Sequence, residues 1–232
     1  MTELLVVRHG QAGPTPENYD QLSPRGRTQA ERLGRWLLDH GRQFSTLVVG
    51  RMRRQGETLD AIRAVYASAG IELPQTITLA GLDEYRFADM LRAFAALEPE
   101  HPDLQRARQN PGDRRFWIGL LRTTLLAWSA GRLPGAPETY AEFQERARAA
   151  LAEIEQRLPS GPVLAVSSGG VMSQLAQQVM GFDDGTAIDV NLQLMNTSVC
   201  EYRLTRSGLK LASLNTLPHL SAVADRALLT LV

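Results

Sequence analysis

The stretch Leu4-Leu5-Val6-Val7-Arg8-His9-Gly10 decides the fold predicted for this chain. Its apolar residues follow one another without a polar break, which is typical of a strand buried on both faces of a sheet. Sheets of that kind are mostly parallel and are covered by helices on both faces. The run ends in Arg8-His9-Gly10, and open α/β sheets place their sites just beyond the carboxyl ends of such strands.

Similar apolar runs recur along the chain and alternate with helical patterns. We expect further buried strands at residues 46–49, 76–79 and 163–166. Residues 199–204 and 209–214 flank a turn at Ser207-Gly208 and predict an antiparallel hairpin. The sequence therefore predicts an α/β fold, a three-layer α/β/α sandwich with a mostly parallel central sheet and an antiparallel edge.

The helical segments have recognisable ends. Ser23 and Pro24 are typical of an N-cap and a first helical residue, and His40-Gly41 is expected to close that helix. A segment from about 85 to 135 carries no strand signal and is interrupted by prolines, so we expect a helical insertion beside the core. With that insertion, residues 1–232 are expected to form a single domain. The other predicted helices cover about 53–69, 140–158 and 169–180.

Composition excludes several classes of protein. Positive and negative residues balance at 25 each, so no nucleic-acid partner is expected. No stretch approaches the roughly 20 apolar residues of a membrane span, and we expect a soluble cytoplasmic protein. The lone Cys200 lies among strand-like residues and is expected to be a buried apolar side chain. An exposed strand edge leaves a monomer or a homodimer open.

Polar residues gather at the predicted carboxyl ends of three strands, where they can share one pocket. His9 follows the first strand, Arg54 comes soon after the second, and Ser168 follows the fourth. An imidazole can attack a phosphoryl group, and guanidiniums can stabilise the negative charge on its oxygens. Gly10 would let backbone amides approach phosphate closely, and Gly169 opens a helix whose amides could do the same.

Several ordered segments resemble the histidine phosphatase superfamily, also called phosphoglycerate mutase-like. Arg8-His9-Gly10 is followed by a helix opening of the form LSxxGxxQA at residues 22–30, and then by an Arg54 four residues before Thr58. Glu84 matches the acidic residue that follows a leucine in that family. The remaining matches are VLAVSSGGVMSQLAQQVMG at 163–181, Asn196-Thr197-Ser198, and the segment 215–220.

This resemblance implies an enzyme that hydrolyses phosphomonoesters without a metal or cofactor. It implies that His9 is transiently phosphorylated and that Glu84 donates a proton to the leaving oxygen. A small phosphorylated molecule is the implied substrate. It implies that Arg8 and Arg54 bind phosphate, and Gly10, Gln11, Ser168 and Gly169 are further predicted phosphate contacts.

The chain departs from the family at Ser168, since the second signature of the family usually reads S-H-G-G. A hydroxyl can still donate a hydrogen bond to phosphate, but the loss of a charged contact is expected to slow catalysis roughly ten- to hundred-fold. Restoring the histidine by Ser168→His is therefore expected to raise hydrolysis. A phosphomutase, or a weak or inactive relative that binds phosphorylated ligands, remains an alternative.

Overall fold

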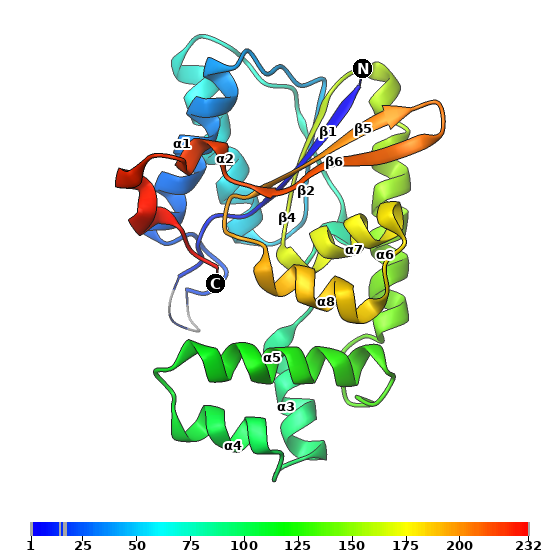
Figure 1. Ribbon diagram of the computed structural model, residues 1–232. Coiled ribbons are helices and arrows are strands. Elements are labelled where there is room, and N and C mark those ends of the chain that lie inside the picture. The colour runs from blue at the N-terminus through cyan, green and yellow to red at the C-terminus, as the bar shows by residue number, and fades with distance from the viewer. Residues whose placement is uncertain (1, 14, 16–17, 232) are drawn as a thin grey trace.

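The computed structural model describes residues 2–13, 15 and 18–231, so residues 14, 16 and 17 of the loop that follows His9 lie outside the described part. A mixed sheet of six strands has the order β3-β2-β4-β1-β5-β6 (Figure 1). The pairs among β1 to β4 are parallel, whereas β5 and β6 add an antiparallel edge. The strands are β1 (Glu3–Arg8), β2 (Thr46–Val49), β3 (Thr76–Thr78), β4 (Val163–Ser167), β5 (Val199–Thr205) and β6 (Gly208–Thr216).

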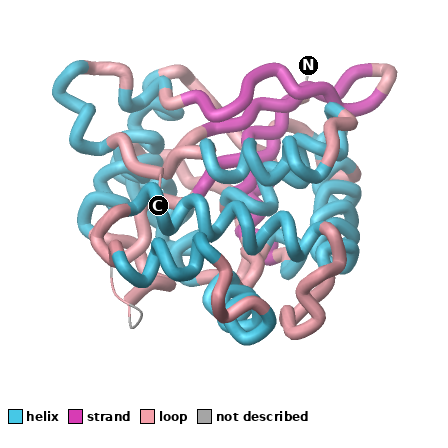
Figure 2. The backbone as a smooth tube through the Cα atoms, turned by 60° about the horizontal axis from the view of Figure 1, so that its bottom comes forward, coloured by secondary structure: helices cyan, strands magenta, loops and turns pink. Residues whose placement is uncertain are grey.

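The two faces of the sheet bury alternate residues of each strand, as the continuous apolar runs require. In β1, Leu5 and Val7 pack with α1 (Pro24–Asp39) and α2 (Arg53–Ser68), while Leu4 and Val6 belong to the larger core on the opposite face. That core includes residues of α6 (Tyr140–Glu155) and α7 (Gly169–Met180). The predicted three-layer α/β/α arrangement is therefore confirmed, and the tube view in Figure 2 shows helices around the strands.

Helix starts follow their local sequence. The Ser23 side chain accepts a hydrogen bond from the Gly26 amide at 3.0 Å, and Pro24 occupies the first helical position as predicted. Thr139 and Glu142 form a reciprocal capping box at the start of α6. These caps fix where each helix leaves the sheet edge.

The predicted insertion consists of α3 (Phe87–Leu97), α4 (Pro102–Gln109) and α5 (Arg114–Ser129), separated by the proline-containing turns. These helices lie together beyond one end of the sheet (Figure 1). A helix that the sequence analysis did not predict, α8 (Asp184–Gln193), lies above α5 and is joined to it by the ion pair of Arg122 and Asp189. The insertion is thus anchored to the core by charge as well as by apolar packing.

The parallel register brings the ends of three strands to one edge. Arg8 of β1 pairs with Ser167 of β4, and Val49 of β2 pairs with Val166 of β4. The residues that follow these strands therefore meet at this edge. Cys200 is buried in β5, as expected. Within the described part of the chain, no helix is long and apolar enough to cross a membrane.

Candidate functional site

His9 occupies the centre of this edge with its imidazole in a defined tautomer. Its Nδ1 lies 2.7 Å from the Gly10 carbonyl oxygen, and its Nε2 lies 3.0 Å from Nε of Arg54. Because a carbonyl can only accept and a guanidinium can only donate, the hydrogen is on Nδ1 and the lone pair is on Nε2. Of the two ring nitrogens, Nε2 is therefore the one whose lone pair is available to attack an electrophile.

The electrostatic surroundings of His9 favour the neutral imidazole. Its side chain is buried, and burial together with the positive charges of Arg54 and Arg8 holds its pKa well below the ordinary value of 6.5. A neutral ring is the form that can attack an electrophile. The backbone of His9 is equally fixed, since its amide donates to the Ser167 carbonyl at 2.9 Å.

Arg54 comes from the first turn of α2 and divides its guanidinium between two partners. While Nε contacts His9, Nη1 donates to Asp20 Oδ1 at 2.9 Å. Arg54 is buried, whereas the Asp20 side chain is 54% exposed. The ring of Tyr19 lies 5.3 Å from the guanidinium carbon. Arg54 thus joins His9 to the loop residues Tyr19 and Asp20.

Arg8 points from the end of β1 toward the C-terminal part of the chain. Its Nη1 donates to the carbonyl oxygens of Leu194 and Leu231. Its Nε is buried and, within the described residues, has no hydrogen-bond partner. A Cβ placed on Gly169 would lie 3.6 Å from that Nε, so the unpaired donor faces the start of α7. An anion at this point would satisfy it.

Glu84 is held at the N-terminus of α7. Its Oε2 accepts a hydrogen bond from the Gly170 amide at 3.0 Å, and its Oε1 accepts one from the Tyr85 amide at 3.2 Å. Burial raises the pKa of this carboxyl above its ordinary value of 4.5, against the opposing effects of the Gly170 amide and of the charges of Arg54 and Arg8. A carboxyl that keeps its proton to higher pH is suited to act as a general acid.

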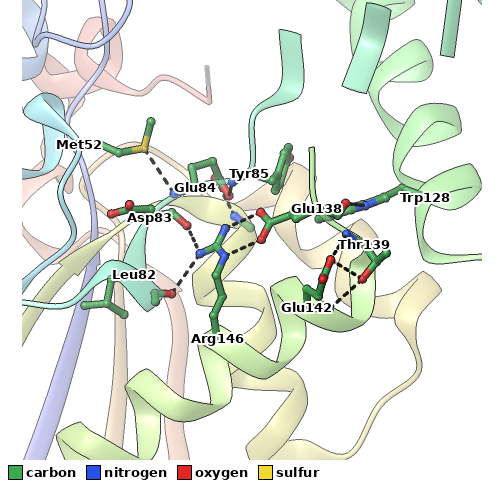
Figure 3. Close-up of polar contacts among 12 residues, drawn as sticks. Met52, Leu82, Asp83, Glu84, Tyr85, Trp128, Glu138, Thr139, Glu142 and Arg146 are labelled. Carbon is green, nitrogen blue, oxygen red and sulfur yellow. Dashed lines mark hydrogen bonds and ion pairs between the residues drawn. The ribbon is translucent and has the colours of Figure 1, made fainter. Parts of the chain in front are cut away.

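The segment that carries Glu84 is clamped from the other side by Arg146 of α6 (Figure 3). Its Nη1 donates to the Asp83 carbonyl at 2.6 Å, and Glu138 binds the same guanidinium through both carboxylate oxygens at 2.8 Å. Arg51 contributes an ion pair with the Asp83 carboxylate at 2.7 Å. Asp83 therefore holds the loop in place, while Glu84 faces α7.

Ser168 and its neighbour complete the edge without contributing a charge. Ser167 Oγ donates to the Leu82 carbonyl at 2.8 Å. Ser168 caps α7 by position, yet its hydroxyl makes no capping bond and accepts instead from Nε2 of Gln55 at 2.8 Å. Both Ser168 and Gln55 are fully buried. The sequence analysis did not single out Gln55, because a glutamine within a charged helical turn gives no signal of burial.

The amides of the loop after His9 are already paired within the protein. The Gly10 amide donates to Thr58 Oγ1 at 3.0 Å, and the Gln11 amide donates to Gln29 Oε1 at 2.8 Å. The Gln11 side chain accepts a hydrogen bond from Ser23 Oγ at 3.0 Å. Gly10 serves a packing role, because a Cβ there would lie 2.9 Å from the carbonyl carbon of Gly26. In this structure both residues brace the loop.

A C-terminal residue, Thr230, also supports the site, and this contact was not predicted from the sequence. The Thr230 hydroxyl accepts from Gln29 Nε2 and donates to Asn196 Oδ1, each at 2.8 Å. The Asn196 side-chain amide donates to the His9 carbonyl at 3.2 Å. Thr197 adopts a left-handed backbone with φ 58°, and its amide donates to the Arg8 carbonyl at 3.1 Å. These contacts tie both ends of the chain to the His9 turn.

The other histidines have structural surroundings. His40 stacks on Trp36 and contacts its carbonyl, as a structural role requires. His219 is buried, with Nε2 2.9 Å from Thr197 Oγ1. His101 caps α4, where its side chain accepts a hydrogen bond from the Asp103 amide, and it packs against Phe94. Among the described residues, no three His, Cys, Asp or Glu side chains gather in a way that could hold a metal ion.

Comparison with known proteins agrees with this geometry. The family model described as histidine phosphatase superfamily (branch 1) matches residues 4–217. No curated protein matches the chain significantly. Three similar solved structures share the fold over nearly the whole chain, at identities too low to transfer more than the fold.

Each of these three structures is a phosphatase by name. A phosphoserine phosphatase mutant from Entamoeba histolytica, in complex with phosphoserine, is 16% identical, with a TM-score of 0.63 and coverage of 95% of this chain and 100% of that one. A putative α-ribazole-5′-P phosphatase from Escherichia coli is 19% identical, with a TM-score of 0.65 and coverage of 93% and 96%. A mycobacterial glucosyl-3-phosphoglycerate phosphatase, in complex with inorganic phosphate, is 21% identical, with a TM-score of 0.63 and coverage of 95% and 100%.

Proposed function

From the premise that this chain belongs to branch 1 of the histidine phosphatase superfamily and is a phosphatase of that superfamily, we propose that it hydrolyses small phosphomonoesters through a phosphohistidine at His9. Nε2 of His9 attacks phosphorus, so that an N–P bond forms and the P–O bond to the leaving group breaks. Glu84 gives its proton to the leaving oxygen. Water then attacks phosphorus, Glu84 takes a proton from it, and the N–P bond breaks to release inorganic phosphate.

One observation carries this proposal, namely the hydrogen bond between Nδ1 of His9 and the Gly10 carbonyl. It leaves Nε2 as the unprotonated atom, and it supports the positive ring that forms once Nε2 carries a phosphoryl group. In this structure Nε2 accepts a hydrogen bond from Arg54, and phosphate oxygens would bind that guanidinium during the reaction. Arg8 supplies a second guanidinium, and its buried Nε has no hydrogen-bond partner among the described residues.

The substrate class follows from the site and its relatives. Arg8 and Arg54 offer two positive charges for a phosphoryl group. The similar structures are named for phosphoserine, α-ribazole-5′-P and glucosyl-3-phosphoglycerate, which are all small phosphorylated molecules. We therefore assign a small phosphomonoester as substrate, with α3 to α5 as the region that selects the leaving group.

We also propose that the chain is an atypical member of its superfamily, with Ser168 at the position of the second signature histidine. Its neutral hydroxyl contributes less to binding the phosphoryl group than a charged imidazole. A slow phosphatase, relative to members with both histidines, is the expected consequence, by roughly ten- to hundred-fold.

The test is hydrolysis of a chromogenic phosphomonoester between about pH 4 and 8, run beside His9→Ala. Wild-type release of inorganic phosphate should exceed that of the variant at least a hundredfold, or by about 3 kcal/mol of barrier. When the substrate carries a label in its phosphoryl group, quenching the reaction with alkali should trap that label on His9. Equal rates for the two proteins would refute the proposal.

A second assay, with a phosphomonoester that carries a free hydroxyl, distinguishes a phosphomutase. In a mutase the phosphoryl group on His9 returns to the substrate, so isomerised ester accumulates faster than inorganic phosphate. We expect inorganic phosphate to account for nearly all of the product, because Glu84 is proposed to activate water for attack on the phosphohistidine.

A further inference from the structure

Gln55 and Ser168 form a buried polar pair beside His9. Gln55 follows Arg54 in the first turn of α2, and Ser168 follows the last residue of β4. Because Arg8 pairs with Ser167 in the parallel register, the next residues, His9 and Ser168, are neighbours at the strand ends. One turn of α2 therefore brings a guanidinium to His9 and an amide to Ser168.

The direction of the hydrogen bond between this pair is fixed by a third group. Nε2 of Gln55 lies 2.9 Å from the Leu82 carbonyl oxygen and 2.8 Å from Ser168 Oγ. A carbonyl can only accept, so the amide nitrogen and not its oxygen faces Leu82. Both amide hydrogens are then used, and Ser168 Oγ acts as the acceptor from Gln55.

This assignment leaves the hydrogen of the Ser168 hydroxyl available. Among the residues that the structure describes, none accepts a hydrogen bond from Ser168. A serine at an N-cap ordinarily accepts from an amide of the first helical turn, and Ser168 does not. The hydroxyl is fully buried, and a buried donor without an acceptor is costly unless a ligand supplies one.

We propose that Gln55 is a positioning residue that keeps the Ser168 hydroxyl as a hydrogen-bond donor to the phosphoryl group transferred to His9. This inference rests on the proposed function. Gln55 acts through Ser168 and does not touch the substrate. By accepting from Gln55, the hydroxyl directs its only hydrogen to the site, which partly compensates for the absence of a charged side chain at this position.

The packing around Gln55 and Ser168 supports the same assignment. A Cβ on Gly50 would lie 2.9 Å from the Leu82 carbonyl and would overlap Oε1 of Gln55, so glycine leaves room for this amide. A larger side chain at position 168 must displace Gln55, because both residues are fully buried and in contact. This changes the expectation from sequence that Ser168→His alone would raise hydrolysis.

The test is a double-mutant cycle with Ser168→Ala and Gln55→Met, the latter nearly isosteric but without donors. Each single variant should lower kcat/KM about tenfold or more and should weaken competitive inhibition by inorganic phosphate. In the Ser168→Ala background, Gln55→Met should have little further effect, since its partner is already gone. Additive losses in both measurements, with unfolding free energies accounted for, would overturn the proposal.

The matched control is Gln178→Met. Gln178 lies on α7, and its amide atoms are buried without a hydrogen-bond partner among the described residues. The same chemical change there should leave kcat/KM and phosphate inhibition unchanged. An equal loss from Gln178→Met would show that Gln55→Met acts through general destabilisation and would overturn the positioning role.

A steric arm completes the experiment. Ser168→His alone should lower kcat/KM, and adding Gln55→Ala should raise it again by making room for the imidazole. A rise with Ser168→His alone would contradict the packing argument. His9→Ala separates the two proposals, because an active His9→Ala refutes the proposed function, whereas an inactive one beside an additive cycle refutes the role of Gln55 only.

Discussion

Gly170→Ala probes the contact between the start of α7 and Glu84 without substituting Glu84 or His9. A Cβ on Gly170 would overlap Glu84 Oε1 and the Tyr85 ring, with Tyr85 Cδ1 at 2.8 Å. Alanine suits the helical backbone at this position, so the perturbation is steric. The carboxyl and the ring must move away from the Gly170 amide, and Glu84 then loses its position for proton transfer.

The expected magnitude follows from the role of that proton. General acid catalysis contributes about 10²- to 10⁴-fold, or about 3–5 kcal/mol of barrier, when the leaving group is an alcohol that cannot depart as an anion. A nitrophenolate leaves without a proton, so its ester should lose less than about tenfold. Overpacking should also lower the unfolding free energy by about 1–3 kcal/mol.

The assay compares kcat/KM for an alkyl phosphate and for nitrophenyl phosphate in wild type, Gly170→Ala and Gly119→Ala. Gly119 lies within α5, and a Cβ there meets nothing within 4 Å, so its alanine should leave activity unchanged and stabilise the helix by about 0.5–1 kcal/mol. If Gly170→Ala lowers the rates of both esters by the same factor, Glu84 is not the acid that the geometry indicates.

Three further results are expected. The rise of kcat/KM with pH should lie well below pH 6.5, because His9 loses its proton there. The fall of kcat/KM should follow the loss of the Glu84 proton, whose pKa is raised above 4.5. Glu84→Gln should therefore lack the alkaline limb of the pH profile. Burial lowers the pKa of His219 from 6.5 to about 4, so the stability contributed by this residue is complete above pH 6.5 and declines as pH falls toward 4. In urea unfolding, the wild type should therefore lose about 3 kcal/mol more stability than His219→Gln over this pH range. Thr58→Val should lower the unfolding free energy by about 1–3 kcal/mol, because the buried Gly10 amide loses its acceptor. Thr124→Val removes a buried hydroxyl that has no partner among the described residues, so this control should be neutral. Equal losses of stability in the two variants would contradict this account.

Much of the architecture could be predicted because its signals are local. The apolar run before His9, the Ser23-Pro24 helix start and the prolines of the insertion each act over a few residues. The helix at 184–193 was missed because its apolar residues do not form a regular stripe, and only Ala187 and Ile188 are buried.

The site could be predicted only where a residue type implied its chemistry. His9 and Arg54 carry reactive or charged groups close after strand ends, Glu84 lies in the loop between β3 and α3, and the structure brings the three near one another. Gln55 is a neutral side chain whose burial depends on which way α2 rotates against β4. The contact of Arg8 with Leu231 joins residues at opposite ends of the sequence, which no local pattern encodes.

The ion pair of Arg54 and Asp20 has a consequence for how such an enzyme completes its cycle. In the resting molecule a carboxylate of the chain already occupies the guanidinium that a phosphate would need. Arrival of the substrate is then an exchange of one anion for another, and departure of inorganic phosphate is the same exchange in reverse. Because Asp20 belongs to the same chain, it competes at a high local concentration, and we expect it to weaken retention of the product.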